Sequence, residues 1–191
     1  LSSQIREIQS AEVESHQSPQ DARKKLANMV NGSKNKGTIR ICIGVPMTSK
    51  GTTMGSVEDS PLWSNLFDSF LKSIDWRSNK YIFRFYLGFD KGDDLYDTGD
   101  AWSDMRTEFR ERARYRIKEQ LVPDADIDAI LDRMLSLKLS HFDHLMGAPT
   151  QVVSQLMLEG YVDGFDYFYQ VNDDTIIETP NWPTVFIDTL L

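Results

Sequence analysis

Short aromatic or β-branched runs alternate with amphipathic stretches along most of the chain. The run Ile39–Pro46 is rich in isoleucine and ends at a proline, which is typical of a buried parallel strand. Tyr81–Leu87 and Tyr167–Val171 have the same character and are likewise followed by polar residues. The pattern therefore predicts three core strands that each lead into a polar loop.

Apolar positions at helical spacing lie between these strands. Ser60 and Pro61 form an N-cap and first-position pair before one such stretch. Its apolar positions fall on one face of a helix: Leu62, Trp63, Leu66, Phe67, Phe70, Leu71 and Ile74. Four further helices are predicted, namely Ser103 (as N-cap) to about Leu121, Asp124–Leu139, Pro149–Gly160 with Gly160 as the stop, and Thr184–Leu191.

The order of these elements predicts the fold. A strand, a helix and a second strand in succession form a right-handed βαβ unit. We therefore expect an α/β domain with three α/β/α layers and a mostly parallel central sheet, similar to the Rossmann arrangement. Because ligands bind at the carboxyl ends of the strands in such sheets, the loops at 47–55, 90–100 and 172–180 are expected to converge on one site.

The composition of the chain changes near residue 37. Residues 1–37 are polar and poor in aromatic side chains, and they are expected to form a stem, a linker or a peripheral helix. Residues 38–191 carry the strands and helices of one folded domain. The first residue is leucine rather than methionine, so we expect the sequence to be a piece of a longer protein.

Charge and composition exclude several classes of protein. A net charge of −8 argues against a nucleic-acid binder, which needs a basic surface. No apolar run reaches about 18 residues, so no membrane span is expected. The single cysteine, Cys42, rules out an internal disulfide framework.

The most informative stretch follows the last predicted strand. There Asn172, Asp173 and Asp174 stand in succession. Two carboxylates held at a strand end form a hard, oxygen-rich site that suits Mg²⁺ or Mn²⁺ carrying a diphosphate. The alternative is an acidic turn that binds nothing, which is common after strands.

Two other loops carry candidate chemistry. After the first strand, Thr48, Ser49 and Lys50 offer hydroxyl groups and a cation that suit a nucleotide, although the residue order of a P-loop is absent. After the second strand, the aspartates between Asp90 and Asp100 predict a solvated acidic turn, with one or two side chains facing a sugar nucleotide.

Two further clusters favour structural roles. His141 and His144 lack the additional ligands that zinc needs, so they are expected to be loop histidines. The arginine-rich stretch from Arg106 to Lys118 is expected to be a solvated helix face paired with glutamates such as Glu108 and Glu111.

The stretch from Gly147 to Asp174 resembles the metal-binding segment of GT-A glycosyltransferases, in which a helix and a hydrophobic strand lead to an Asp-x-Asp motif. It is particularly close to viral and eukaryotic members that carry Asp-Tyr-Phe-Tyr-Gln and Asn-Asp-Asp before Pro-x-Trp, here Asp166–Gln170, Asn172–Asp174 and Pro180-Asn181-Trp182. Ile41–Pro46 with Thr48-Ser49-Lys50, and Gly88-Phe89-Asp90, look like the family's first and second nucleotide-contacting segments. The resemblance covers roughly residues 39–190.

By position, the resemblance implies that Asp174 is the principal metal ligand and that Asp173 contacts the ribose or the metal. Asn172 stands where the family often has its first aspartate, and its amide oxygen is a neutral, weaker ligand. The nucleotide pocket would be lined by Val45, Pro46, Thr48 and Asp90, beside Ser49 and Lys50 of the first loop.

The implied function is a glycosyltransferase that moves a sugar from a nucleotide-diphosphate sugar to an acceptor hydroxyl of a glycan, protein or lipid, with Mn²⁺ or Mg²⁺ as cofactor. No catalytic base can be named, because the sequence ends 17 residues after Asp174 and the family's base lies well beyond the metal motif. The resemblance also implies a Golgi or secretory lumen in a eukaryote, or the cytoplasm for a virus or bacterium.

Two alternatives stay open. One is a catalytically inactive GT-A-like module with a binding or structural role in a larger assembly, which Asn172 and the short C-terminal part favour. The other is a nucleotidyltransferase, which would need more basic residues in the first loop than Lys50.

Overall fold

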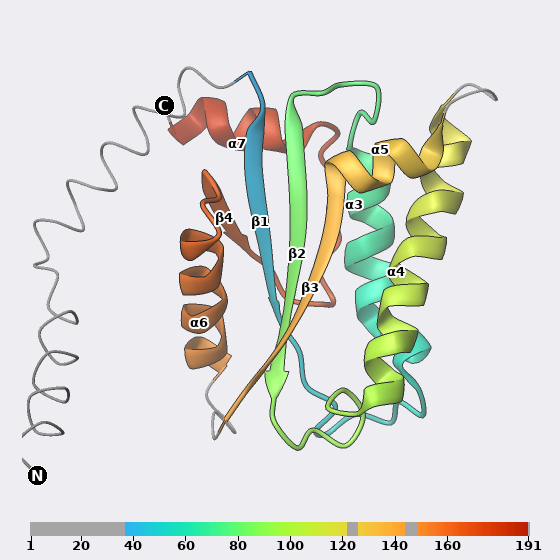
Figure 1. Ribbon diagram of the computed structural model, residues 1–191, viewed down its shortest axis with the longest axis vertical. Coiled ribbons are helices and arrows are strands. Elements are labelled where there is room, and N and C mark those ends of the chain that lie inside the picture. Colours follow the sequence, from blue (N-terminus) through green and yellow to red (C-terminus); the bar gives the residue numbers. More distant parts are fainter. Residues whose placement is uncertain (1–36, 122–125, 144–148, 191) are drawn as a thin grey trace, which may run out of the picture. The chain divides into compact units, whose positions relative to one another are not determined.

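Four parallel strands form the centre of the molecule in the computed structural model, which describes residues 37–121, 126–143 and 149–190 (Figure 1). The central strand β1 (Ile39–Pro46) pairs on one side with β2 (Tyr81–Asp90) and on the other with β4 (Tyr167–Gln170). β2 pairs in turn with β3 (Leu135–Phe142), which gives the order β3-β2-β1-β4. The expected α/β, Rossmann-like class with a parallel sheet is therefore confirmed.

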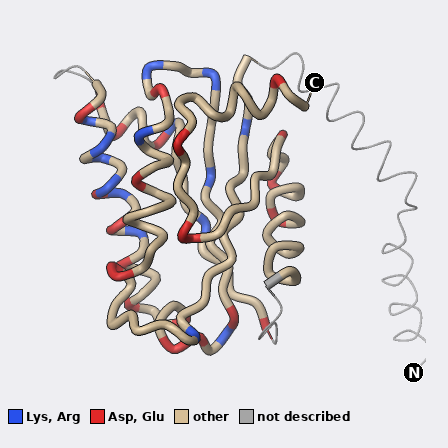
Figure 2. Tube along the Cα trace, turned by 180° about the vertical axis from the view of Figure 1, so that it is seen from behind, with Lys and Arg blue, Asp and Glu red and all other residues tan. Residues whose placement is uncertain are grey.

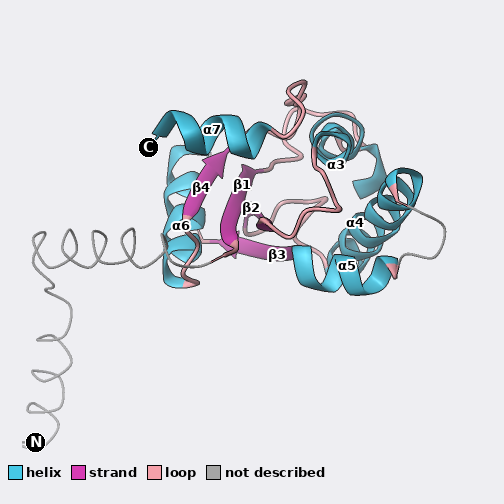
Figure 3. Ribbon diagram, turned by 90° about the horizontal axis from the view of Figure 1, so that it is seen from above, coloured by secondary structure: helices cyan, strands magenta, loops and turns pink. Residues whose placement is uncertain are grey.

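Helices cover both faces of this sheet (Figure 3). One face carries α6 (Pro149–Val162), which contacts β1, β2 and β4. The larger core on the other face receives side chains from six helical elements: the 3₁₀ turn η2 (Val57–Asp59), the π-helical turn η3 (Leu62–Phe67), α3 (Asp68–Ser73), α4 (Gly99–Gln120), α5 (Ile127–Met134) and α7 (Trp182–Leu190).

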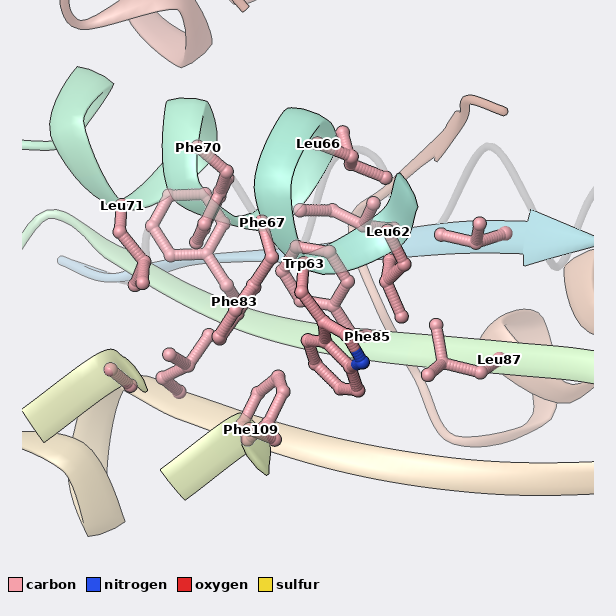
Figure 4. Close-up of a cluster of buried hydrophobic side chains, with 14 of the residues drawn as sticks. Leu62, Trp63, Leu66, Phe67, Phe70, Leu71, Phe83, Phe85, Leu87 and Phe109 are labelled. Carbon is pink, nitrogen blue, oxygen red and sulfur yellow. The ribbon is translucent and has the colours of Figure 1, made fainter. Parts of the chain in front are cut away.

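Aromatic side chains fill the larger core (Figure 4). Successive strand residues point to opposite faces. Phe83 and Phe85 of β2, two positions apart, therefore both point into the larger core beneath η3 and α3. Phe85 meets Phe67 of η3 edge to face with ring centroids 5.3 Å apart, and Phe83 meets Phe70 of α3 in the same way at 5.0 Å. Such geometries suit the quadrupoles of the rings and fix η3 and α3 on the sheet.

The opposite face is packed closely because glycines replace side chains there. Cys42 and Tyr86 are buried against Val152 and Leu156 of α6. A Cβ at Gly44 of β1 would lie 2.4 Å from Cζ of Phe168, and a Cβ at Gly160 of α6 would lie 2.9 Å from Sγ of Cys42. Both glycines are therefore needed for the close approach of α6, β1 and β4.

One predicted helix was wrong in part. The stretch expected to be helical from Asp124 to Leu139 contains α5 and, from Leu135 onward, the strand β3. Leu135, Leu137 and Leu139 alternate with polar residues, and this period of two places them opposite Phe83, Phe85 and Leu87 of β2. The pattern was readable, but it follows a helical stretch without a turn residue in between.

Three predicted helix ends also differ from the structure. α4 begins at Gly99 under the N-cap Thr98, whose Oγ1 accepts a hydrogen bond from Ala101 N at 3.1 Å, and not under Ser103. α6 runs past Gly160, and the turn after it uses Gly164 with φ +75°. α7 begins at Trp182, two residues before the expected start.

Basic and acidic residues are dense along α4 (Figure 2), and its arginines form ion pairs on the surface, as expected. Arg112 pairs with Glu108, and Arg114 pairs with Glu111 and with Asp128 of α5. Exposed pairs of this kind contribute little stability each. Their main consequence is a strongly hydrated outer surface for α4.

Within the part of the chain that the structure describes, no helix is long and apolar enough to cross a membrane. The polar segment expected at residues 1–37 lies almost wholly outside the described residues.

The tight contact at Gly44 predicts a large stability loss for a small substitution. Gly44→Ala should lower the free energy of unfolding by about 1–3 kcal/mol, because the added methyl group overlaps the Phe168 ring. Gly99→Ala is the matched control, since no heavy atom outside its neighbours lies within 4 Å of a Cβ there. Urea unfolding of both variants measures the effect, and equal stability of the two would contradict this packing account.

Candidate functional site

The strand order places a topological switch point between β1 and β4. From β1 the chain moves outward through β2 to β3, and it then returns to add β4 on the other side of β1. In open parallel sheets, ligands bind outside the carboxyl ends of the strands at such a point. The residues that follow β1 and β4 are therefore the first place to look for a binding site.

The pairing of β4 with β1 brings the Asn-Asp-Asp sequence to this point. Gly44 lies opposite Gln170, and the backbone N–H of Val171 donates to Gly44 O at 3.1 Å. The register is fixed at the other end by Arg40, whose backbone N–H donates to Asp166 Oδ2 at 2.8 Å and whose guanidinium donates to Gly164 O at 2.9 Å.

Asn172, Asp173 and Asp174 form a turn directly after this pairing. Thr175 N donates to Asn172 O at 3.2 Å and closes the turn. Asn172 and Asp174 are exposed, whereas Asp173 is half-buried. The turn thus offers solvent one amide oxygen and one full carboxylate, with a second carboxylate immediately behind them.

The carboxyl group of Asp173 lies in an unfavourable electrostatic environment. Burial raises its pKa above the ordinary value, and the neighbouring negative charge of Asp174 raises it further. No ion pair of either carboxylate with a described Lys, Arg or His lies within salt-bridge distance. A cation bound between the two side chains would relieve both effects.

The donor atoms at this turn suit a magnesium or manganese ion that also binds a phosphate ligand. No group of three or more His, Cys, Asp or Glu side chains that could hold a metal occurs among residues 37–121, 126–143 and 149–190. Mg²⁺ commonly takes only one or two protein carboxylates and completes its octahedron with water and substrate phosphates. Asp173 and Asp174, with the amide oxygen of Asn172, fit that incomplete set.

Asp93 joins the loop after β2 to the loop after β1. Its carboxylate accepts hydrogen bonds from Ser49 Oγ at 2.6 Å and from the backbone N–H groups of Ser49, Leu95 and Tyr96 at 2.9, 3.1 and 3.0 Å. Burial alone would raise the pKa of Asp93, but the four hydrogen bonds outweigh it and hold the pKa below its ordinary value. Asp93 is therefore a fixed anionic anchor for both loops.

Tyr96 extends this anchor to Ser60, which lies just before η3. Its buried hydroxyl donates to Ser60 Oγ at 3.1 Å. Burial raises the pKa of the Tyr96 phenol to about 12, and the charges of Asp173 and Asp93 act in the same direction. The parallel pairing of β4, β1 and β2 places the loops that follow these strands at the same end of the sheet, and Asp93 joins two of them.

Asp90 occupies the carboxyl end of β2 with an incomplete set of partners. Its side chain is almost entirely buried, and Lys50 Nζ approaches Oδ2 at 4.0 Å. Asp90 Oδ1 has no hydrogen-bond partner, which is costly for a buried carboxylate oxygen. A ligand that brings an N–H or O–H donor would satisfy it.

The other residues predicted for the nucleotide pocket differ in what they can offer. Val45 is fully buried in the larger core, so only its backbone could face a ligand, whereas Pro46 is half-buried at the edge of the sheet. Thr48 is exposed and accepts a hydrogen bond from Lys50 N at 3.2 Å. The hydroxyl of Ser49 is already bound to Asp93, which gives Ser49 a positioning role.

The acidic loop is less solvated than predicted. Asp90 and Asp93 are buried, and Asp97 is half-buried, where it accepts a hydrogen bond from Gly92 N at 2.7 Å. His141, expected in a loop, lies in β3 with Nδ1 2.8 Å from Asp97; His144 lies outside the described residues.

Sequence reasoning also missed Tyr96 as a site residue. The available signal was its position shortly after Asp90, in the loop that follows β2.

Comparisons with known proteins add no relative to this picture. No protein-family model matches the chain, and neither a curated protein nor a solved structure matches it significantly.

The raised pKa of Asp173 predicts that its carboxylate destabilises the fold. Between 3.8, the ordinary value, and the raised value, the folded state binds more protons than the unfolded one, so stability falls as pH rises through that window. Asp173→Asn should therefore raise the melting temperature at pH 7, and the gain should vanish below the window.

Differential scanning calorimetry at several pH values measures this change, with the exposed Asp94→Asn as a control for the loss of one negative charge. A stability gain of 1 kcal/mol corresponds to about 2–4 °C for a domain of this size. A lower melting temperature for Asp173→Asn at pH 7 would mean that the wild-type carboxylate already has a counter-charge.

Proposed function

We propose that residues 38–191 form the nucleotide-sugar-binding domain of a metal-assisted glycosyltransferase of the GT-A type. The observation that carries this proposal is the position of Asp173 and Asp174, two adjacent carboxylates on a turn at the switch point of a parallel sheet. An acidic turn without a ligand would gain nothing from a half-buried Asp173 whose pKa is raised by burial and by its neighbour Asp174.

The surroundings of this turn support a nucleoside diphosphate as the ligand. Asp90 has a buried oxygen that lacks a donor, and nucleoside bases such as uracil and guanine carry ring N–H groups that could supply it. Lys50 lies beside Asp90 and could contact a phosphate. Thr48 adds an exposed hydroxyl in the same loop. The base, ribose and diphosphate would thus extend from the end of β2 towards the turn after β4.

A divalent cation on Asp173 and Asp174 would neutralise the diphosphate of the departing nucleotide as the glycosidic bond breaks. The contribution of the protein would then be positioning, since Asp93 and Tyr96 hold the two nucleotide loops in a fixed arrangement before the ligand arrives. We assign no general base, because no described residue is placed by these contacts next to an acceptor hydroxyl.

Calorimetric titration with UDP and with GDP, each with and without Mn²⁺, tests the proposal. We expect binding of one nucleotide that requires Mn²⁺ and is lost in Asp174→Ala, because removing the exposed carboxylate takes away a direct ligand. Asp94→Ala, another exposed aspartate on a neighbouring loop, should bind like the wild type.

The possible results separate the candidate classes. Metal-dependent binding followed by hydrolysis or transfer of the sugar would support the enzyme. Absence of binding of either nucleotide by the folded wild type would contradict the proposal and favour the catalytically inactive module. Binding that is unchanged in Asp174→Ala would contradict the assigned metal site.

A further inference from the structure

His141 and Asp97 connect the end of β3 to the loop after β2. His141 Nδ1 lies 2.8 Å from Asp97 Oδ1, and the other carboxylate oxygen of Asp97 accepts a hydrogen bond from Gly92 N at 2.7 Å. The side chain of Asp97 is 16% exposed and that of His141 is 44% exposed. One carboxylate therefore holds the beginning of the loop against an imidazole of the neighbouring strand. We call these two residues the histidine–aspartate pair.

The contacts continue from this pair to the candidate site. Asp97 N donates to Asp93 O at 3.0 Å, and Asp93 N donates to Asp90 O at 3.1 Å. The carboxylate of Asp93 in turn accepts hydrogen bonds from Ser49 in the loop after β1. A few hydrogen bonds thus connect His141 to Asp90, whose buried Oδ1 has no hydrogen-bond partner.

Charges of both signs surround the histidine–aspartate pair. Lys91, in the loop after β2, pairs with Asp143 at 3.0 Å and also acts on Asp97 as a nearby positive charge. On the side of α4, the indole ring of Trp102 lies against the imidazole with ring centroids 5.5 Å apart, and the guanidinium of Arg106 lies over the same indole ring. Among these types of side chain, imidazole is the one that ordinarily changes its charge between pH 5 and 8.

Asp97 is the fixed anion of the pair. The hydrogen bond with His141 lowers the pKa of Asp97 below its ordinary value, and the bond from Gly92 N acts in the same direction. A cationic imidazole carries a proton on both ring nitrogens, so its Nδ1–H donates to the carboxylate as one half of an ion pair. A neutral imidazole has one proton for the two nitrogens, and the contact loses its ionic part. The contact is therefore strongest at low pH and weakens as pH rises through this range.

We propose that His141 is a positioning residue for the loop after β2, and that loss of its proton loosens this loop and weakens nucleotide binding. The second half rests on the proposed function, because it takes Asp90 as part of the nucleotide site. A looser loop leaves Asp90 and Ser49 less fixed before the ligand arrives, so binding has to order them at a cost in affinity. The pair is partly exposed, which limits the effect to a change of a few fold.

Amide exchange in the loop tests the first half, with His141→Gln as the variant. Glutamine can still donate to Asp97, but its charge does not change with pH. We expect the protection factors of the Gly92 and Asp97 amides, corrected for the intrinsic pH dependence of exchange, to fall about two- to fivefold from pH 6 to pH 8 in the wild type. They should stay constant in His141→Gln, whereas Asp94→Asn, at an exposed aspartate of the same loop, should behave like the wild type. The same pH dependence in the wild type and in His141→Gln would overturn the proposal.

Nucleotide titration at the same two pH values tests the second half. UDP or GDP, whichever binds with Mn²⁺, should lose about two- to fivefold more affinity between pH 6 and pH 8 with the wild type than with His141→Gln. Protonation of the phosphates and of Asp173 affects both proteins alike, so the comparison removes it. An equal loss in the two proteins would overturn the connection between the loop and the site. If neither nucleotide binds the folded protein, the proposed function fails and this connection fails with it, while the protection factors still decide whether His141 holds the loop.

Discussion

The parallel pairing of β4 with β1 is the constraint on which the candidate site depends. It joins residues more than 120 positions apart, and Arg40 fixes the register through Asp166 and the carbonyl groups of Asp163 and Gly164. A shift of one residue would turn every β4 side chain to the opposite face of the sheet. Phe168 would then lose its place over Gly44, and the Asn172–Asp174 turn would leave the switch point.

The aspartates around this turn differ in how well their carboxylate oxygens are compensated by hydrogen-bond donors or cations. Asp93 is buried with four hydrogen-bond donors and anchors the loops after β1 and β2. Asp173 is half-buried and Asp90 Oδ1 is buried, and neither has comparable partners. Their cost to stability makes sense if a ligand supplies what the protein lacks, which is a cation at Asp173 and a hydrogen-bond donor at Asp90.

Much of the fold followed from local sequence patterns, and the errors have physical causes. The strand at Ile39–Pro46 was predicted with its observed bounds, because its apolar run ends at a proline. β3 was assigned to a helix because its leucines continue a helical stretch, and only the neighbouring strand β2 selects the alternating pattern. Gly160 was taken as a helix stop, although contact with Cys42, far away in sequence, is what requires a glycine there.

The site could be predicted in part, because local sequence patterns locate the ends of strands. Asn172–Asp174 and Asp90 stand at strand ends, which sequence patterns locate. The bonds of Asp93 to Ser49, and the bond of Tyr96 to Ser60, depend on segments that meet only in the folded protein. In the loop at residues 90–100, no local pattern could separate the buried aspartates from the exposed ones.

The most direct test of the account is to locate the cation in solution by paramagnetic broadening. With Mn²⁺ and UDP or GDP added, the amide signals of Met47, Tyr96 and Thr175 should weaken most in the NMR spectrum. The signals of Ile39 and Tyr81 should persist, because these residues begin β1 and β2 at the opposite end of the strands. At roughly 3.3 Å per strand residue, they lie about 25 Å away. Broadening centred elsewhere, such as at the aspartates of α5, would contradict a metal site at the switch point.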